Sequence, residues 1–357
     1  MEYDNFNKMI NTSINNLVKD AVRVSIKNPE MLKFLLKSVV KQKRAAKLRE
    51  ENEKLGVHVP PFMITSITHK CNLKCKGCYA QAQHEGNTAE MNSDKLEGLL
   101  KEAAELGVSI VLLAGGEPLV RKQEIFQITK KFPQIIFPMF TNGILIDNET
   151  IENLSIQRNL IPVVSIEGYE GDTDIRRGEG TYKRIMKLLE EFKSKNIFYG
   201  VSITITSLNY NTVSNDDFIE DLINKGNKLF FYVEYVPVKE GTEELILTEE
   251  QRLYISELMN SLRSKFQSLF IAFPGDEEAL GGCLAAGRGF VHVSPEGNLE
   301  PCPFAPFSDT NLKDKSLKEA LKSDFLKKIR QNHQLLTEEQ GGCALWENRE
   351  FVESLLK

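Results

Sequence analysis

The feature that most constrains the fold is the regular alternation, between residues 60 and 269, of short apolar runs and amphipathic helical stretches. The apolar runs predict strands at 62–68, 109–113, 135–140, 161–166, 197–206 and 229–236. Helical patterns follow these strands at 93–106, 123–131, 147–157, 181–195, 215–224 and 248–268. Such repeats predict an α/β fold with a parallel sheet and right-handed crossovers, either an open doubly wound sheet or a barrel.

Polar and glycine-bearing segments follow the first four predicted strands. These segments are Cys71 to Cys78, Gly115 to Pro118, Thr141 to Gly143, and Glu167 with Gly168. In barrels and in open parallel sheets alike, functional side chains collect at the carboxyl ends of the strands. We therefore expect all four segments on one face of the molecule.

Residues 1–56 form a predicted N-terminal extension that is basic, with twelve Lys and Arg against seven Asp and Glu. Asn28 and Pro29 are typical of a helix start, which predicts helices near 12–27 and 29–54. The second helix carries an apolar stripe among basic side chains, made of Leu32, Leu35, Leu36, Val39 and Val40. Either the stripe packs on the body of the protein, or residues 12–54 make a peripheral contact with a membrane or a partner.

The pattern changes near residue 274, so we predict a core domain at 57–274 and a small C-terminal domain at 275–357. This domain contains Gly281-Gly282-Cys283, a short strand at 290–293, a turn at 294–298, a helix at 316–330 and Gly341-Gly342-Cys343. Its apolar content is low for an independent core of this size. A metal centre is therefore expected to help hold it together.

Composition excludes several classes of protein. The chain has 357 residues, and 45 Lys and Arg against 50 Asp and Glu give a net charge of −5, which disfavours nucleic acid as the main partner. Six cysteines are too few for a disulfide-dense secreted domain, and the first ten residues lack a signal-peptide pattern. The sequence contains no stretch of 18 predominantly apolar residues, which is about the length needed to span a membrane. We expect a cytoplasmic protein, with membrane association as the open alternative.

Three of the six cysteines, Cys71, Cys75 and Cys78, lie within eight residues of one another after the first predicted strand. Structural zinc would need a fourth ligand, for which His69 is nearby, but paired C-x-x-C motifs are the usual zinc pattern. An electron-transfer cluster normally uses four cysteines. A cubane cluster with three cysteine ligands would leave one iron open for chemistry. Three unrelated buried cysteines are the remaining interpretation.

The motif Cys71-x-x-x-Cys75-x-x-Cys78, followed by Gly115-Gly116-Glu117-Pro118, resembles the radical S-adenosylmethionine (SAM) superfamily. The resemblance implies a partial (β/α)6 TIM-like barrel and a [4Fe-4S] cluster on the three cysteines, with SAM on the open iron. It also implies SAM binding by the second motif, in which the glycines allow close backbone approach and Glu117 accepts from the SAM ammonium group.

Further residues resemble the SPASM/Twitch-type subfamily. By this resemblance Ser165 and Arg177 approach SAM, and Asn142 and Asn209 lie at comparable strand ends. Two positions depart from the family pattern. The first is Gly77, where an aromatic residue often precedes the third cysteine, so adenine packing would depend on Lys76 or on the backbone. The second is Glu167, where Asp is usual.

The second cysteine triplet, Cys283, Cys302 and Cys343, with Gly297 between the first two, also resembles this subfamily. The resemblance implies a Twitch-like C-terminal domain with a second, auxiliary [4Fe-4S] cluster. Its fourth ligand would be a substrate atom, water, or a side chain such as His292, Glu296 or Glu300. The cluster would brace the domain, accept an electron or bind substrate.

The resemblance implies a radical SAM oxidoreductase that oxidises or cross-links a substrate at a C–H position, using a reductant such as flavodoxin or ferredoxin. Peptide or protein maturation is the favoured substrate class, and oxidation of a small molecule or a lipid at a membrane surface is the alternative. A non-enzymatic electron carrier would explain the cysteines but not the Gly-Gly-Glu-Pro motif. No catalytic side chain is assigned. The strand-end residues that could face substrate are Glu167, Tyr169, Glu234 and Tyr235.

Overall fold

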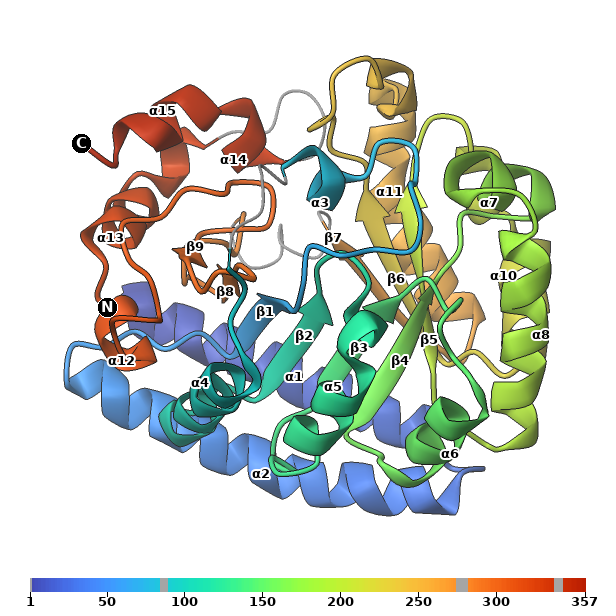
Figure 1. Cartoon of the computed structure of the whole chain (residues 1–357), viewed down its shortest axis with the longest axis horizontal. Helices are drawn as coiled ribbons and strands as arrows, with labels where there is room; N and C mark the ends of the chain where they lie inside the picture. Colours follow the sequence, from blue (N-terminus) through green and yellow to red (C-terminus); the bar gives the residue numbers. More distant parts are fainter. Residues whose placement is uncertain (1, 84–88, 274–281, 337–342) are drawn as a thin grey trace.

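The structure is a computed structural model that describes residues 2–83, 89–273, 282–336 and 343–357. Within these ranges nine strands form one curled sheet in the order β7-β6-β5-β4-β3-β2-β1-β8-β9 (Figure 1). Strands β1 to β8 are parallel to their neighbours, and β9 is antiparallel to β8. The strands are β1 (Phe62–Ser66), β2 (Ile110–Ala114), β3 (Phe137–Thr141), β4 (Leu160–Ser165), β5 (Gly200–Ile205), β6 (Leu229–Glu234), β7 (Leu269–Phe273), β8 (Phe290–Val293) and β9 (Leu299–Glu300).

Helices cover the outer face of the curled sheet, with α4, α5, α6, α8 and α10 around it and α2 passing beneath it (Figure 1). The helices before β7 are α1 (Glu2–Val24), α2 (Pro29–Lys54), α3 (Tyr79–Ala82), α4 (Ser93–Leu106), α5 (Lys122–Thr129), α6 (Asn148–Ile156), α7 (Glu170–Arg177), α8 (Thr181–Ser194), α9 (Tyr210–Val213), α10 (Asp216–Asn224) and α11 (Glu249–Lys265). Those after β9 are α12 (Leu317–Ala320), α13 (Asp324–Gln331), α14 (Ala344–Glu347) and α15 (Arg349–Ser354).

The predicted α/β partial barrel is confirmed, and the sheet extends beyond the six predicted strands at both edges. At one edge β7 adds a seventh parallel strand beside β6. At the other edge β8, which lies within the predicted C-terminal domain, pairs with β1 from Phe62 to Thr65. The predicted boundary between residues 274 and 275 lies outside the described residues, as do Gly281, Gly341 and Gly342. A separate C-terminal domain therefore stays a prediction.

The single helix predicted at 316–330 is wrong in its continuity, because the structure has α12 and α13 there. Ser316 and Glu319 form a capping box at the start of α12. The Ser323 side chain then accepts a hydrogen bond from the backbone of Leu326 and starts α13. Two N-caps seven residues apart end the first helix after one turn.

Helix α2 begins where predicted, because the Asn28 side chain accepts a hydrogen bond from the Met31 backbone and Pro29 is the first helical residue. The predicted apolar stripe is wrong in part, since Leu36 and Val40 are 54% and 69% exposed. The buried face of α2 is rotated about the helix axis relative to the predicted stripe, and it includes polar side chains. It consists of Met31, Leu35, Ser38, Gln42, Arg49 and Asn52.

Helix α1 lies across the end of the barrel at which the strands begin. Ala21 belongs to the same apolar cluster as six residues that lie within two positions of the starts of six strands, and Leu17, Val22 and Val24 pack against this cluster. The six residues are Ile110, Ile136, Ile161, Phe198, Leu229 and Leu269. Helix α1 therefore forms a floor beneath the barrel.

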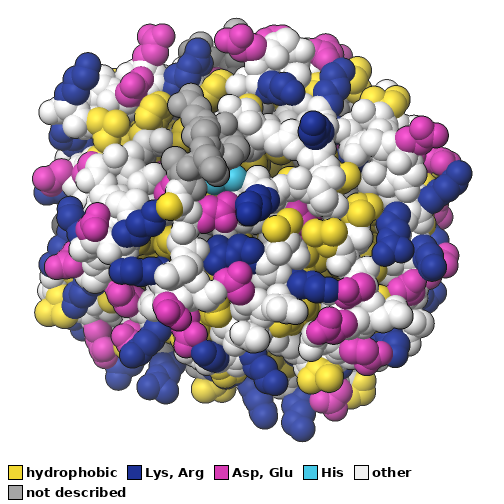
Figure 2. Space-filling model, viewed as in Figure 1, with side chains coloured by type: hydrophobic (Ala, Val, Ile, Leu, Met, Phe, Trp, Pro, Cys, Tyr) yellow, Lys and Arg dark blue, Asp and Glu magenta, His cyan; other side chains and the backbone are white. Residues whose placement is uncertain are grey.

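The face of the molecule seen in Figure 2 carries Lys and Arg side chains interspersed with Asp and Glu. Among the described residues, none of the helices is both long enough and apolar enough to cross a membrane.

Candidate active site

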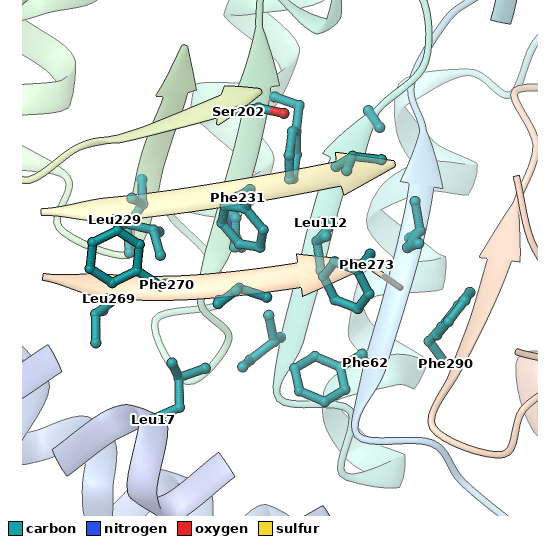
Figure 3. Close-up of a pocket in the computed structure, with 18 of the residues that line it drawn as sticks. Leu17, Phe62, Leu112, Ser202, Leu229, Phe231, Leu269, Phe270, Phe273 and Phe290 are labelled. Carbon is teal, nitrogen blue, oxygen red and sulfur yellow. The ribbon is translucent and has the colours of Figure 1, made fainter. Parts of the chain in front are cut away.

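A cavity of about 1550 Å³ occupies the interior of the barrel and opens to the molecular surface. Alternate residues of the strands point inward, so that Ile64, Leu112, Phe231 and Phe273 line it. The preceding residue of each strand belongs to the buried core: Met63, Val111, Phe230 and Ala272. Figure 3 shows Phe62, Leu112, Phe231 and Phe273 around this space, with Leu17 of α1 at one end. The same cavity reaches both cysteine triplets.

The first triplet lies in the loop after β1. Cys71, Cys75 and Cys78 are free thiols, all partly exposed, and all three line the cavity. The Leu73 backbone donates to Cys71 Sγ at 3.5 Å, and Arg177 Nη1 lies 4.0 Å from Cys75 Sγ. Burial raises the pKa of the Cys75 thiol, while the two guanidinium groups of Arg177 and Arg176 act in the opposite direction. Hydrogen-bond donors around sulfur are typical of a site that holds thiolates.

The Gly-Gly-Glu-Pro segment after β2 lies directly against this loop. The Gly116 backbone donates to the Thr68 carbonyl at 2.7 Å, and the Glu117 backbone donates to the Lys70 carbonyl at 2.9 Å. A Cβ at Gly116 would lie 2.4 Å from the Lys70 carbonyl oxygen, and one at Gly115 would lie 2.6 Å from that of Thr68. Only glycine therefore lets the two backbones approach this closely.

The Glu117 carboxylate is fully buried and holds the ends of two strands together. It accepts from the Leu119 backbone at 3.0 Å, from Thr141 Oγ1 at 2.8 Å and from the Asn142 backbone at 2.8 Å. Burial raises its pKa, and these hydrogen bonds oppose that shift. Glu117 also lines the cavity, and its carboxylate already accepts three hydrogen bonds. Its contact with SAM stays a prediction.

The remaining predicted SAM residues differ in placement. Asn142 lines the cavity and donates from Nδ2 to Asn72 at 2.8 Å. Ser165, at the end of β4, and Arg177 also line the cavity. Asn209 is 4% exposed and donates to the carbonyl oxygens of Glu167 and Thr204, so it braces the loops behind the cavity.

Glu167 is an ion-pair centre rather than an inward-facing group. Its Oε1 accepts from Arg176 Nη1 at 2.5 Å and from Arg177 Nε at 2.7 Å, and its Oε2 accepts from the Thr204 backbone at 3.1 Å. Burial lowers the pKa of Arg177, but the charges of Glu167 and Cys75 outweigh this and raise it. The carboxylate therefore holds Arg177 beside the cysteine loop. Sequence reasoning did not find Arg176, the second arginine of this clamp.

The other three candidates for substrate contact lie in different surroundings. Glu234 and Tyr235 line the cavity, and Glu234 pairs with Arg252 at 3.0 Å. Tyr169 is 41% exposed and its hydroxyl donates to Asp221, so it faces the outer surface.

Gly77 is covered by the ring of Tyr235, which follows β6. A Cβ on Gly77 would lie 2.5 to 2.9 Å from ring and hydroxyl atoms of Tyr235, and the Gly77 φ is +68°. The Tyr235 hydroxyl is 2.6 Å from Thr242 Oγ1, which fixes the ring. At the position where the family often has an aromatic residue, an aromatic side chain from the segment after β6 therefore packs instead.

We expect Gly77→Ala to loosen the cysteine loop, because the methyl group has no space and the backbone conformation disfavours it. The cost is about 1 to 3 kcal/mol of unfolding free energy, measured by urea denaturation, together with less iron bound after reconstitution. Gly171→Ala is the matched control, because its Cβ would meet no atom within 4 Å in helix α7. Equal stability and iron content in the two variants would contradict this account of Gly77.

The second triplet is assembled from distant parts of the chain. Cys302 and Cys343 are buried, Cys283 is partly exposed, and all three line the cavity. A hydrogen bond with Cys343 and burial both raise the pKa of Cys302, and the charge of Cys283 adds to this. The Tyr79 ring, next to Cys78, packs edge-on against Phe304 at 5.0 Å between centroids. An aromatic contact thus joins the loops of the two triplets.

The side chains considered as a fourth ligand have other partners. His292 bonds Ser66 Oγ at 2.8 Å through Nε2 and Glu300 at 2.7 Å through Nδ1. Glu296 is paired with His69 and accepts from Ser294. Each would have to leave these contacts to bind a metal. Across the described ranges, no group of three or more His, Cys, Asp or Glu side chains is arranged to hold a single metal ion.

The donor set fits an iron–sulfur cluster at the first triplet, because three free thiols face one cavity with N–H donors at Cys71 and a guanidinium group at Cys75. A partial βα barrel with this loop after β1 and a glycine pair packed against it after β2 defines a radical SAM enzyme. Residues 65–222 match the family model described as "Radical SAM superfamily". Residues 65–222 therefore form a radical SAM domain, and members of this superfamily bind a [4Fe-4S] cluster and SAM.

Several known proteins are similar to the chain. An AdoMet-dependent heme synthase of Methanosarcina barkeri is 23% identical over 81% of this chain and 89% of the relative. The Bacillus subtilis protein AlbA, named for biosynthesis of the antilisterial bacteriocin subtilosin, is 26% identical over 76% of this chain and 61% of the relative. The structure of Streptococcus suis SuiB bound to its precursor peptide SuiA covers 90% of this chain and 76% of that chain, with a TM-score of 0.62 and 21% identity. This structural similarity supports the fold.

Proposed function

We propose that the chain uses the first triplet and the Gly-Gly-Glu-Pro segment to bind a [4Fe-4S] cluster and SAM, and acts on a C–H bond of a substrate in the barrel. The supporting observation is that Cys71, Cys75 and Cys78 share one cavity with Gly115 to Glu117. When bound, the cluster and SAM supply reductive cleavage of SAM and a 5′-deoxyadenosyl radical that removes a hydrogen atom from substrate.

The chain's own residues would position these groups. The Arg177 guanidinium, held by Glu167, places a positive charge beside Cys75. The Asn142 amide lies 3.9 Å from Cys71 Sγ. The apolar walls of the barrel would shield the reacting centre from water.

Anaerobically reconstituted protein is expected to release 5′-deoxyadenosine when dithionite and SAM are added, as measured by liquid chromatography. The matched control omits dithionite, because cleavage needs an electron. Failure to form 5′-deoxyadenosine, with both clusters loaded and reduced, would refute the radical SAM function for this chain.

The second triplet supports a SPASM/Twitch-type auxiliary cluster. Its support is the contact between Cys302 and Cys343, with Cys283 near enough to raise the Cys302 pKa. Its place on the same cavity as the first triplet suits electron acceptance from a substrate radical or ligation of substrate. A flavodoxin or ferredoxin would supply the electron for the first cluster.

Two substrate classes have separate support. A peptide is supported by relatives whose names state peptide products or complexes, AlbA and SuiB bound to SuiA. A small molecule or lipid is supported by the apolar lining of the cavity and by the heme synthase relative.

A peripheral membrane contact through α2 is supported by Leu36 and Val40, which are exposed beside Lys33, Lys37 and Arg44. We expect the double variant Leu36→Ser and Val40→Ser to bind anionic vesicles at least about threefold less well, because apolar insertion is lost while the lysines remain. Co-sedimentation measures this, and Ile156→Ser is the control, since Ile156 is 75% exposed on α6. Equal losses in both variants, or no loss, would exclude α2 as the contact.

A further inference from the structure

The barrel interior is hollow below the cysteine loops. Barrels of this general type normally fill their interior with layers of inward-pointing side chains. Here Ile64, Leu112, Ile271 and Phe273 point inward from β1, β2 and β7 and stay only partly buried, because they line the cavity. The cavity volume of about 1550 Å³ includes the sites proposed for both clusters and SAM, and it exceeds the range of roughly 300–1,000 Å³ that is typical of a pocket for one small ligand.

The cavity wall is polar along some strands and apolar along others. Ser165, Ser202 and Thr204 line it from β4 and β5. On β7 the lining positions from Leu269 to Phe273 are apolar, over a depth of about 13 Å at ~3.3 Å per residue. Leu17 (Figure 3) and Ala21 form an apolar part of the α1 floor, beside the polar residues Ser13 and Asn16.

The apolar side of the cavity is poorly suited to a peptide. A peptide carries an N–H and a C=O in almost every residue, and each such group buried without a partner costs free energy. Phe62, Ile64, Leu112 and Ile271 offer no side-chain donor or acceptor, and the N–H and C=O groups of these parallel strands pair within the sheet. A hydrocarbon chain loses no hydrogen bonds on entering such a space and gains by leaving water.

The cavity also reaches the molecular surface at α1. Met9 and Ile26 belong to its lining and are 45% and 67% exposed. Lys8, Asp20 and Arg23 of α1 are also part of the lining, and Arg23 forms an ion pair with Asp20 at 2.9 Å. An apolar path with charged groups at its outer end matches an amphipathic molecule with a polar head and a long hydrocarbon tail.

We infer that the barrel binds the hydrocarbon chain of a lipid-class substrate, acyl or isoprenoid, with the chain between the cysteine loops and the α1 floor. This inference rests on the proposed function for its chemical step, in which a C–H hydrogen of the chain moves to the 5′-deoxyadenosyl radical and leaves a carbon radical. Binding of the chain itself does not depend on that step.

The test is binding of cis-parinaric acid, a polyene fatty acid that fluoresces in apolar surroundings, to the reconstituted full-length protein with SAM and without reductant. We expect saturable binding of one molecule per chain, displaced by oleic acid or by geranylgeraniol. The tighter competitor identifies an acyl or an isoprenoid chain. Leu112→Trp and, independently, Ile271→Trp fill the cavity and are expected to weaken binding at least about tenfold.

Ile156→Trp is the matched control, because it adds the same indole on the exposed face of α6 and should change the affinity by less than about twofold. Circular dichroism and iron content establish that each variant is folded. The inference is overturned if binding is not saturable, if neither cavity variant differs from the control, or if a hydrophilic peptide displaces the probe as well as oleic acid does. Because no reductant is present, a failure of SAM cleavage leaves this result intact.

Discussion

The triple variant Cys71→Ala, Cys75→Ala and Cys78→Ala is expected to lose about half of the bound iron and all SAM-dependent formation of 5′-deoxyadenosine. In the proposed function these three thiols bind the first cluster, and removing them leaves no thiol in the loop after β1. Loss of the electron donor to SAM removes the entire rate acceleration rather than a fraction of it. Iron and sulfide assays on anaerobically reconstituted protein, with quantification of 5′-deoxyadenosine, measure both effects.

The control is the complementary triple variant at Cys283, Cys302 and Cys343. It should lose the other half of the iron and still form 5′-deoxyadenosine, because the first triplet remains intact. An unchanged iron content in the first variant would refute a cluster at Cys71 to Cys78. Complete loss of iron in either variant would show that the two triplets share one centre.

The first triplet and the glycine pair could be predicted because their function depends on local spacing. Cys71 to Cys78 lie within one loop, and Gly115 and Gly116 are glycines for a reason that the chain itself supplies, the close approach of the β1 loop. Roles that depend on long-range contacts were harder to predict. The neighbours Glu167 and Arg177 were both named, but nothing in the sequence indicated that Arg176 completes their clamp.

The N-terminal helices show why burial is harder to predict than secondary structure. The start of α2 depends on Asn28 and Pro29 alone and was correct. The buried face was displaced because the fold buries polar residues that find partners elsewhere. Arg49 donates to the Gly107 carbonyl, and Asn52 donates to that of Leu106. Periodicity counts apolar residues and gives no information about such distant acceptors.

The cavity could not be predicted for a related reason. Alternating apolar residues on β1, β2 and β7 have the same sequence pattern whether their side chains meet at the barrel axis or stop short of it. Strand β7 itself was missed because Leu269 to Phe273 directly follows a long helical pattern. The curvature of the whole sheet, which includes this strand, decides whether the interior is filled.

Glu167→Gln is expected to destabilise the protein by about 3 to 5 kcal/mol, because it leaves two arginines without their counter-charge in a nearly closed site. The Glu167 side chain is 1% exposed, and those of Arg176 and Arg177 are 12% and 10% exposed. Glutamine keeps the shape and the acceptor for the Thr204 backbone but loses the charge. Urea denaturation of the apoprotein measures the change in unfolding free energy. Affinity for SAM in reconstituted protein should fall as well, since Arg177 is no longer held beside Cys75.

Two further variants separate a clamp from a generic loss of charge. Glu152→Gln removes one partner of the exposed pair with Lys195 and should cost less than about 0.5 kcal/mol, because water already screens that pair. Glu167→Asp restores the charge one methylene shorter, so it cannot reach both arginines and the Thr204 backbone at once. It should therefore recover only part of the stability and SAM affinity. Full recovery in Glu167→Asp would show that the negative charge matters and the length of the side chain does not. A Glu167→Gln variant as stable as Glu152→Gln would contradict the clamp.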